Sequence, residues 1–274
     1  MQVTSFPRPS SLSLSFHIHV STTVHSSTHP LSLSSQPQNI LGMLETGSRD
    51  LGFAGRDWVE ELGADVVEVL DTELDPVRLV VAAPDADILT KGVGAGGRKL
   101  IVASEYVGIT EKWIAEKKMD ATLFRAYGAT ESLPPEDADC IIDNTATGST
   151  LKANGLHIID TVMRSSTRMF ASKAAMADPA KAARIESLRL LLQSVLDARA
   201  RRMLTVNIPD SMLEAVIQLM PCMRAPTVME LKGTGGFHAV QAAVRTGELP
   251  ALIPKLKELG AMDIIVQPIG QIIG

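Results

Sequence analysis

The chain has 274 residues, of which 45% are hydrophobic and 21% are charged. At about 100–200 residues per domain, this length predicts more than one compact unit, each with a buried core. The 26 basic and 31 acidic side chains give a formal net charge of −5, which argues against binding to nucleic acid or to an anionic membrane surface. Every apolar stretch is well short of the roughly 20 residues that span a bilayer, so we expect no transmembrane segment.

The two cysteines, Cys140 and Cys222, lie far apart in the sequence. They show neither CxxC spacing nor a matching cluster of cysteine and histidine. A disulfide framework and a structural zinc site are therefore not indicated. We expect both cysteines to be buried, reduced thiols of an intracellular protein.

The first 40 residues differ in composition from the rest of the chain. They are rich in Ser, contain no acidic residue and have a single arginine, Arg8. Such a segment buries too little apolar surface to fold, so we predict a disordered head over residues 1–40. The composition is also that of an organelle transit peptide, although those are usually richer in Arg; sequence wrongly joined upstream of the coding region is an equal alternative.

From Ile40 onward, segments typical of strands alternate with segments typical of helices. We predict a helical turn over residues 57–62 and strands over residues 50–55, 66–70, 78–83, 99–103, 122–127 and 138–143. Helices between several of these strands indicate an α/β architecture with a largely parallel sheet.

A long helix is predicted from Asp178 to about Arg202. One face carries apolar residues at helical spacing, and we expect that face to be core: Ile185, Leu188, Leu192, Val195 and Leu196.

The last part of the chain has the pattern of a small separate module. Strands are predicted over 203–208, 227–231, 237–244 and 263–269, and helices over 210–219 and 250–259. The order βαββαβ is the ferredoxin-like plan, which is common in small regulatory modules.

Two of three Gly-rich clusters carry no phosphate-binding signal. Residues 91–99 precede a predicted strand, whereas phosphate loops follow strands and open helices, so a surface loop is expected there. Residues 233–236 join two predicted strands and are explained by a hairpin turn.

The third cluster, residues 140–151, has the order expected of a phosphate-binding site. An apolar strand ends at Asp143, and a hydroxyl-rich turn with Thr147, Ser149 and Thr150 leads into a helix start. Backbone amides and hydroxyls would converge there on a phosphate. Asp143 would accept hydrogen bonds from ribose hydroxyls or hold a water of Mg²⁺. A Ser/Thr helix cap is the alternative, but the whole arrangement favours phosphoribose binding.

The order and spacing of short motifs over residues 44–274 resemble the ATP phosphoribosyltransferases, in the long form with a regulatory domain. The motifs lie at residues 50–53, 103–106, 128–131, 143–151, 153–156, 165–168, 224–228 and 259–264. The resemblance implies a two-lobed catalytic region of the periplasmic-binding-protein kind and a ferredoxin-like regulatory domain. It places lobe I at residues 41–84 and 173–200, lobe II at 85–172 and the regulatory domain at 201–274.

The resemblance also implies an activity, that of a pentosyltransferase. Members join N1 of ATP to C1 of phosphoribosyl pyrophosphate (PRPP), require Mg²⁺ and release pyrophosphate, giving phosphoribosyl-ATP in the first step of histidine biosynthesis. L-Histidine acts as feedback inhibitor, and the long form assembles as a homo-hexamer, with a dimer as the low-activity state. The expected location is cytoplasmic, or plastid if the head is a transit peptide.

Residue roles follow from matching positions to the family motifs. Asp143 and Glu131 are expected at the catalytic site, although Glu131 also fits a solvated turn carboxylate. The PRPP loop comprises Asp143, Thr145, Ala146, Thr147, Gly148, Ser149 and Thr150. The histidine pocket comprises Asn207, Met223, Thr227, Ala243 and Asp263, where Asn207 and Asp263 depart from the expected residue types. Metal ligands are not assigned.

The start of the chain departs from the family pattern. Family members open with a strand and a Leu-Pro-Lys-Gly-Arg type loop that contributes to nucleotide binding, and residues 1–43 do not match it. An incomplete first lobe, exposed sheet edges and a weakened ATP site are therefore expected. The alternative function is that of a catalytically inactive regulatory or small-molecule-binding chain with the same fold.

Overall fold

The computed structural model describes residues 20–22, 31–33, 35–91, 98–221, 223, 225–233 and 235–274. Its contacts divide the chain into two units, Met1–Lys181 and Ala182–Gly274, each of which is described by itself. Most of the predicted Ser-rich head, the Gly-rich stretch 92–97 and Cys222 lie outside the described residues. Within the described ranges, no helix is long and apolar enough to cross a membrane.

Three elements occupy the range predicted to be disordered. The short strands β1 (Val20–Thr22) and β2 (Leu31–Leu33) pair in antiparallel fashion. Helix α1 (Pro37–Glu45) begins before position 40, with Pro at the start of the helix, where its missing N–H costs no hydrogen bond. Because α1 buries Ile40, Leu41 and Leu44, the folded region starts earlier than predicted.

The first unit is built on one six-stranded sheet. Its strands, in spatial order, are β3 (Leu51–Gly55), β8 (His157–Ala171), β4 (Val67–Ala83), β7 (Cys140–Thr145), β5 (Leu100–Ser104) and β6 (Ala121–Arg125). The pairs β5–β6 and β5–β7 are parallel, and the other pairs are antiparallel. The prediction of a largely parallel sheet was wrong, because β4 was read as two short strands and β8 was missed.

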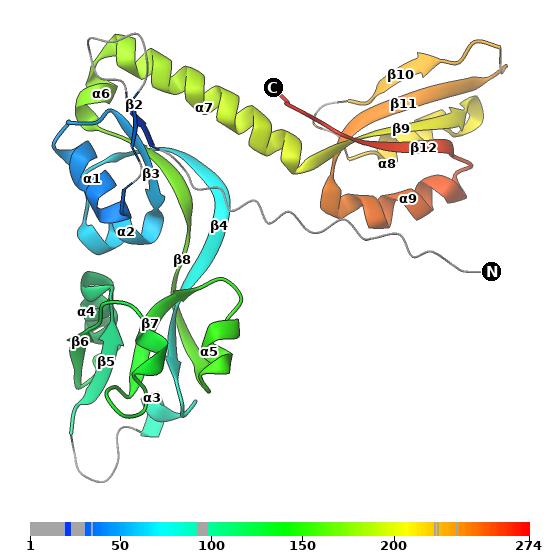
Figure 1. Ribbon diagram of the computed structural model, residues 1–274. Coiled ribbons are helices and arrows are strands. Elements are labelled where there is room, and N and C mark those ends of the chain that lie inside the picture. Colours follow the sequence, from blue (N-terminus) through cyan, green and yellow to red (C-terminus); the bar gives the residue numbers. More distant parts are fainter. Residues whose placement is uncertain are drawn as a thin grey trace, which may run out of the picture. The chain divides into compact units, whose positions relative to one another are not determined.

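The long strands β4 and β8 run side by side through both lobes of this unit (Figure 1). In lobe I, the end of β8 pairs with β3; in lobe II, the residues from Arg78 to Ala82 of β4 pair with β7. Each long strand therefore belongs to both lobes. The predicted lobe boundaries, after residues 84 and 172, lie just past the ends of β4 and β8.

Helices cover the two lobes and meet at their junction. Lobe I carries α1 and α2 (Arg56–Leu62), and lobe II carries α3 (Ile88–Lys91), α4 (Val107–Glu116), the 3₁₀ turn η1 (Thr130–Ser132) and α5 (Ser149–Ala153). Trp58 of α2 packs against the buried clusters of both lobes, and its ring lies 4.8 Å from that of Tyr106. The lobes therefore share an aromatic contact.

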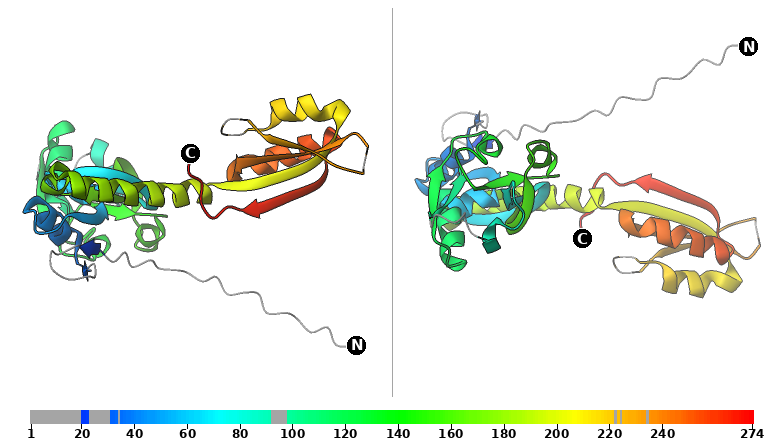
Figure 2. Two further views of the ribbon diagram at one scale, coloured as in Figure 1. Left: turned by 90° about the horizontal axis from the view of Figure 1, so that it is seen from above. Right: turned by 90° about the horizontal axis from the view of Figure 1, so that it is seen from below.

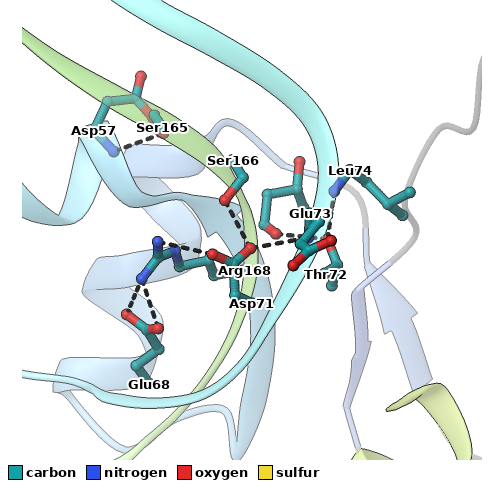
Figure 3. Close-up of polar contacts among 10 residues, drawn as sticks. Asp57, Glu68, Asp71, Thr72, Glu73, Leu74, Ser165, Ser166 and Arg168 are labelled. Atoms are coloured by element: carbon teal, nitrogen blue, oxygen red, sulfur yellow. Dashed lines mark hydrogen bonds and ion pairs between the residues drawn. The ribbon is translucent and has the colours of Figure 1, made fainter. Parts of the chain in front are cut away.

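An ion-pair cluster stabilises the irregular part of β4 (Figure 3). Arg168 of β8 contacts Glu68 at 2.6 Å and Asp71 at 2.8 Å, and Asp71 also accepts hydrogen bonds from Ser166 Oγ and from the backbone N–H of Glu73. Burial opposes ionisation of Asp71, but these bonds and the Arg168 charge hold its pKa below the usual range. The cluster lies where the pairing register of β4 and β8 shifts.

The second unit contains the C-terminal module, whose predicted order βαββαβ is confirmed. Its antiparallel sheet has the order β10 (Thr227–Glu230), β11 (Phe237–Arg245), β9 (Arg201–Pro209), β12 (Met262–Pro268). Helices α8 (Leu213–Leu219) and α9 (Leu249–Glu258) lie on one face, as Figure 2 shows. They enclose a core with Leu204, Val240 and Leu256. The short 3₁₀ turns η2 (Asp210–Met212) and η3 (Thr246–Glu248) precede the helices.

A short helix precedes the long predicted helix. Helix α6 (Lys173–Ala177) precedes it, and the helix itself is α7 (Pro179–Arg199). By its contacts, the chain divides into the two units within α7, between Lys181 and Ala182. The expected core face of α7 is only partly covered: Ile185 is buried, but Leu188 is 37% exposed. Periodicity identified the helix but overestimated its burial, because covering a face requires a partner from elsewhere in the fold.

Candidate active site

The end of β7 presents Asp143 at the carboxyl edge of the lobe II strands. Ile141 and Ile142 anchor the strand in the core, where both are fully buried. The Asp143 carboxylate accepts a hydrogen bond from Thr130 Oγ1 at one oxygen and from the Asn144 backbone N–H at the other, each at 2.7 Å. Strand, 3₁₀ turn and loop thus hold the carboxylate in one orientation.

The electrostatic surroundings of Asp143 oppose its ionisation. Burial raises the pKa of Asp143, and the negative charge of Glu131 raises it further, whereas the hydrogen bonds from Thr130 and Asn144 act in the opposite direction. Glu131, in η1, is half-buried next to Thr130. The structure therefore brings the two predicted catalytic carboxylates into one neighbourhood, which is a setting that binds cations.

The turn after β7 has the geometry of a preformed loop. Thr145 Oγ1 accepts a hydrogen bond from Gly148 N at 2.9 Å, and the hydroxyls of Thr147 and Ser149 lie 2.9 Å apart. Gly148 has φ +80° and immediately precedes α5. Thr147, Ser149, Thr150 and Ala146 are exposed, whereas Thr145 is buried. The N-cap residue is Gly148, and Thr147 Oγ1 accepts a hydrogen bond from the following Ser149 N at 3.3 Å.

A buried polar chain reaches the same loop and was not foreseen from the sequence. Ser165 Oγ donates to Asp57 Oδ1 at 2.7 Å, and Tyr106 Oη donates to Asp57 Oδ2 at 2.7 Å. Asn144 Nδ2 in turn donates to Tyr106 Oη at 2.8 Å. Figure 3 shows Asp57 beside Ser165 at the start of α2. No local pattern signals this chain, because its members come from four separate elements.

Position 55 must be glycine for this chain to form. A Cβ atom there would lie 2.2 Å from Asp57 Oδ1, which is far inside contact distance. Any larger residue would therefore displace the Asp57 carboxylate from Ser165 and Tyr106.

The structure also forms a hollow of about 490 Å³ among α2, α4 and β8. It is lined by cations and anions alike, including Arg56, Lys112, Arg164, Glu60 and Glu116. None of the predicted PRPP-loop residues lines it.

The residues predicted for the histidine pocket lie in different places in the C-terminal module. Met223 and Ala243 line a hollow of about 270 Å³ together with Pro221, Arg201, Arg245 and Glu248. Thr227 begins β10 and pairs with Gln241 of β11. Asn207 Nδ2 donates to Asp263 Oδ2 at 2.9 Å. Asn207 lies four residues beyond Met203, the β9 residue that pairs with Ala243, so it is roughly 13 Å along the strand from the hollow. The five predicted residues therefore do not all lie around one hollow within a single chain.

No group of three or more His, Cys, Asp or Glu side chains with metal-binding geometry occurs among the described residues.

Comparison with known proteins identifies the family. A family model described as ATP phosphoribosyltransferase matches residues 36–194, and one described as HisG, C-terminal domain, matches residues 198–271. The ATP phosphoribosyltransferase of Methanocella arvoryzae is 38% identical over 242 residues, covering 88% of this chain and 84% of the relative. That of Chlorobium phaeovibrioides is 37% identical over 241 residues, covering 86% and 81%.

A solved structure supports the fold. A chain of the ATP phosphoribosyl transferase (HisG:HisZ) complex from Thermotoga maritima aligns with a TM-score of 0.53 at 22% identity, over 61% of this chain and 79% of that one. At this identity the likeness concerns the fold alone, and it agrees with the expected two-lobed α/β architecture.

The fold defines a two-lobed α/β protein with a ferredoxin-like C-terminal module. The chain belongs to the ATP phosphoribosyltransferase family. The expected activity in the first step of histidine biosynthesis is thereby confirmed at the level of the family, and the inactive alternative is not favoured.

Proposed function

We propose that residues 143–150 bind the phosphoribosyl group of PRPP while it is transferred to N1 of ATP. The observation that carries the proposal is the Asp143 carboxylate, held by two donors at the end of a buried strand, directly before exposed hydroxyls. Amides and hydroxyls of residues 147–150 face the 5′-phosphate, and Asp143 accepts hydrogen bonds from the ribose hydroxyls.

The chemistry calls for positioning and charge stabilisation. Bond breaking at C1 develops positive charge on the ribose ring and negative charge on the leaving pyrophosphate. Asp143, with Glu131 close by, stabilises the positive ring, and the loop holds the 5′-phosphate so that C1 faces the attacking nitrogen. No protein nucleophile is needed.

Magnesium fits the site as a partner of the substrate. Asp143 and Glu131 would hold it, with PRPP oxygens completing its coordination. When bound, the ion neutralises charge on the departing pyrophosphate.

The test is a turnover assay that follows phosphoribosyl-ATP formation from ATP, PRPP and Mg²⁺. We expect Asp143→Ala to lower kcat/KM for PRPP roughly 100-fold. Asp137→Ala is the matched control, since Asp137 is an exposed carboxylate in the preceding loop. Equal activity of the Asp143 variant and the control would refute the assignment.

The hollow in the C-terminal module is proposed as the L-histidine site. Arg201 and Arg245 supply charges for the carboxylate of the amino acid, Glu248 supplies one for its ammonium group, and Met223 and Ala243 provide apolar contact. Asn207, Thr227 and Asp263 remain proposed contributors. In this proposal, Asn207 and Asp263 reach the ligand from a neighbouring subunit of a homo-hexamer, with a dimer as the low-activity state.

Histidine titration tests this regulatory proposal. We expect Arg245→Ala to raise the histidine concentration for half-inhibition at least tenfold while uninhibited kcat stays within twofold. Sedimentation with and without histidine reports the oligomer. Unchanged inhibition in the variant would remove the hollow as the site.

Location is proposed as cytoplasmic, or plastid if residues 1–40 act as a transit peptide. The support is the Ser-rich, acid-free composition of that segment. Fusion of residues 1–40 to a fluorescent reporter distinguishes the two locations.

A further inference from the structure

The buried polar chain joins the two lobes and ends at the residue next to Asp143. Asp57 lies on α2 of lobe I, and Ser165 lies on β8 where that strand crosses between the lobes. Tyr106 follows β5 of lobe II, and Asn144 belongs to β7. Asp57 and Ser165 are 5% exposed and Tyr106 is 1% exposed, so water does not compete for the bonds among these three side chains, whereas Asn144 is exposed.

The direction of each bond is set by chemistry. The Asp57 carboxylate only accepts, so Ser165 and Tyr106 must both donate to it. Burial raises the pKa of Tyr106 far above its usual value, and the charge of Asp57 raises it further, so the hydroxyl keeps its proton. The Tyr106 oxygen is then free to accept from the Asn144 side chain.

Asn144 links the polar chain to Asp143 through its side chain and its backbone. Its side chain is held by Tyr106, and its backbone N–H donates to Asp143 Oδ1 at 2.7 Å. The other Asp143 oxygen is held by Thr130 from η1. The bond from Asn144 Nδ2 to Tyr106 Oη therefore anchors the side chain of the same residue whose backbone N–H fixes one Asp143 oxygen.

We propose that Tyr106 is a positioning residue for phosphoribosyl transfer, which acts through Asn144 on Asp143 and makes the orientation of the PRPP loop depend on Asp57 of the other lobe. The inference rests on the proposed function, since it assigns to Asp143 the role of contacting the ribose. It adds a specific route by which lobe I supports a site that lies on lobe II.

The experiment measures PRPP binding by calorimetry, in the presence of Mg²⁺, together with steady-state kinetics on the full chain. Tyr106→Phe removes the hydroxyl, and with it the bond from Asn144 Nδ2, but keeps the ring against Trp58. Asn144→Ala removes the same Asn144–Tyr106 bond by deleting its donor. We expect each variant to raise the Kd for PRPP about 5- to 10-fold and to lower kcat/KM for PRPP at least as much, with KM for ATP within twofold.

The double variant separates positioning from other roles. If Tyr106 acts through Asn144, Tyr106→Phe/Asn144→Ala binds PRPP no more weakly than the weaker single variant. Thr72→Val is the matched control, because it removes another buried hydroxyl bond, to Thr167 O at 2.6 Å, that does not lead to Asp143. It should leave the Kd within twofold.

Each contrary outcome has a distinct meaning. Additive losses in the double variant overturn the route through Asn144, and so does an unchanged Kd in both single variants. An equal loss in Thr72→Val would show general destabilisation and overturn the inference. A wild-type chain that fails to bind PRPP, or an Asp143→Asn variant that binds it normally, overturns the proposed function itself.

Discussion

Glu61 of lobe I contributes to the contact between the lobes by capping helix α4 of lobe II. Helix α4 starts after Tyr106, whose side chain makes no capping bond. Instead, the Glu61 carboxylate of α2 accepts hydrogen bonds from Gly108 N and Ile109 N, each at 3.0 Å. A carboxylate at a helix N-terminus satisfies free amides and interacts favourably with the helix dipole.

We expect Glu61→Ala to lower the free energy of unfolding by about 2 kcal/mol, as two bonds to a charged, partly exposed acceptor are lost. The neighbouring Glu60 provides a matched control on the same helix. Its ion pair with Lys112, at 3.2 Å, joins side chains that are 47% and 63% exposed, so Glu60→Ala should cost under about 0.5 kcal/mol.

Urea unfolding followed by tryptophan fluorescence measures both variants. The two tryptophans of the chain, Trp58 and Trp113, lie on α2 and α4 and report directly on this contact. With a slope of about 2 kcal/mol per M, the urea midpoint of Glu61→Ala should fall by about 1 M. A midpoint equal to that of Glu60→Ala would refute the capping role.

Three further predictions concern the loop and the C-terminal module. Because the pKa of Asp143 is raised and its ionised form binds the ribose, kcat/KM for PRPP should fall as pH is lowered through that pKa, and Asp143→Asn should abolish this dependence. The same raised pKa means that ionised Asp143 lowers the free energy of unfolding at higher pH and that this effect vanishes in acid. Unfolding of the wild type and of Asp143→Asn, measured as a function of pH, would reveal it. Gly148→Ala places a Cβ at φ +80° and 3.4 Å from Ile158 Cδ1, so it should cost about 1 kcal/mol and weaken PRPP binding in calorimetry, whereas unchanged binding would argue against a preformed loop. Leu256→Ala empties a fully buried site of the C-terminal core and should cost about 3 kcal/mol in a melt of that unit, with a loss under 1 kcal/mol contradicting the packing described.

The candidate loop was accessible from the sequence because its signals are local. An apolar run, a terminal carboxylate and a hydroxyl-rich turn with one glycine lie within residues 140–151, and the structure keeps them as strand, turn and short helix. Asp143 and Glu131 were also expected together, from motif resemblance, and the structure places them close enough to influence each other.

The sheet was less accessible, since pairing partners come from distant parts of the chain. β4 contains Glu73 and Asp75 at positive φ, so a turn-like stretch lies within the strand, between the two short strands that were predicted. The continuous strand is held by β8, through Arg168 and the residues beside it. Local strand propensity contains no information on the β4–β8 pairing or on the Arg168 ion pairs.

By itself, the sequence determined the alternation of elements, the βαββαβ module and the family motifs, because each depends on residues a few positions apart. Only the tertiary structure decided that two long antiparallel strands join the lobes, that the expected face of α7 is partly exposed, and that Asp57, Tyr106 and Asn144 form one chain. These three residues are separated by 49 and 38 positions. A bond across such a separation depends on how the whole sheet and its helices pack, and no local pattern of residues encodes it.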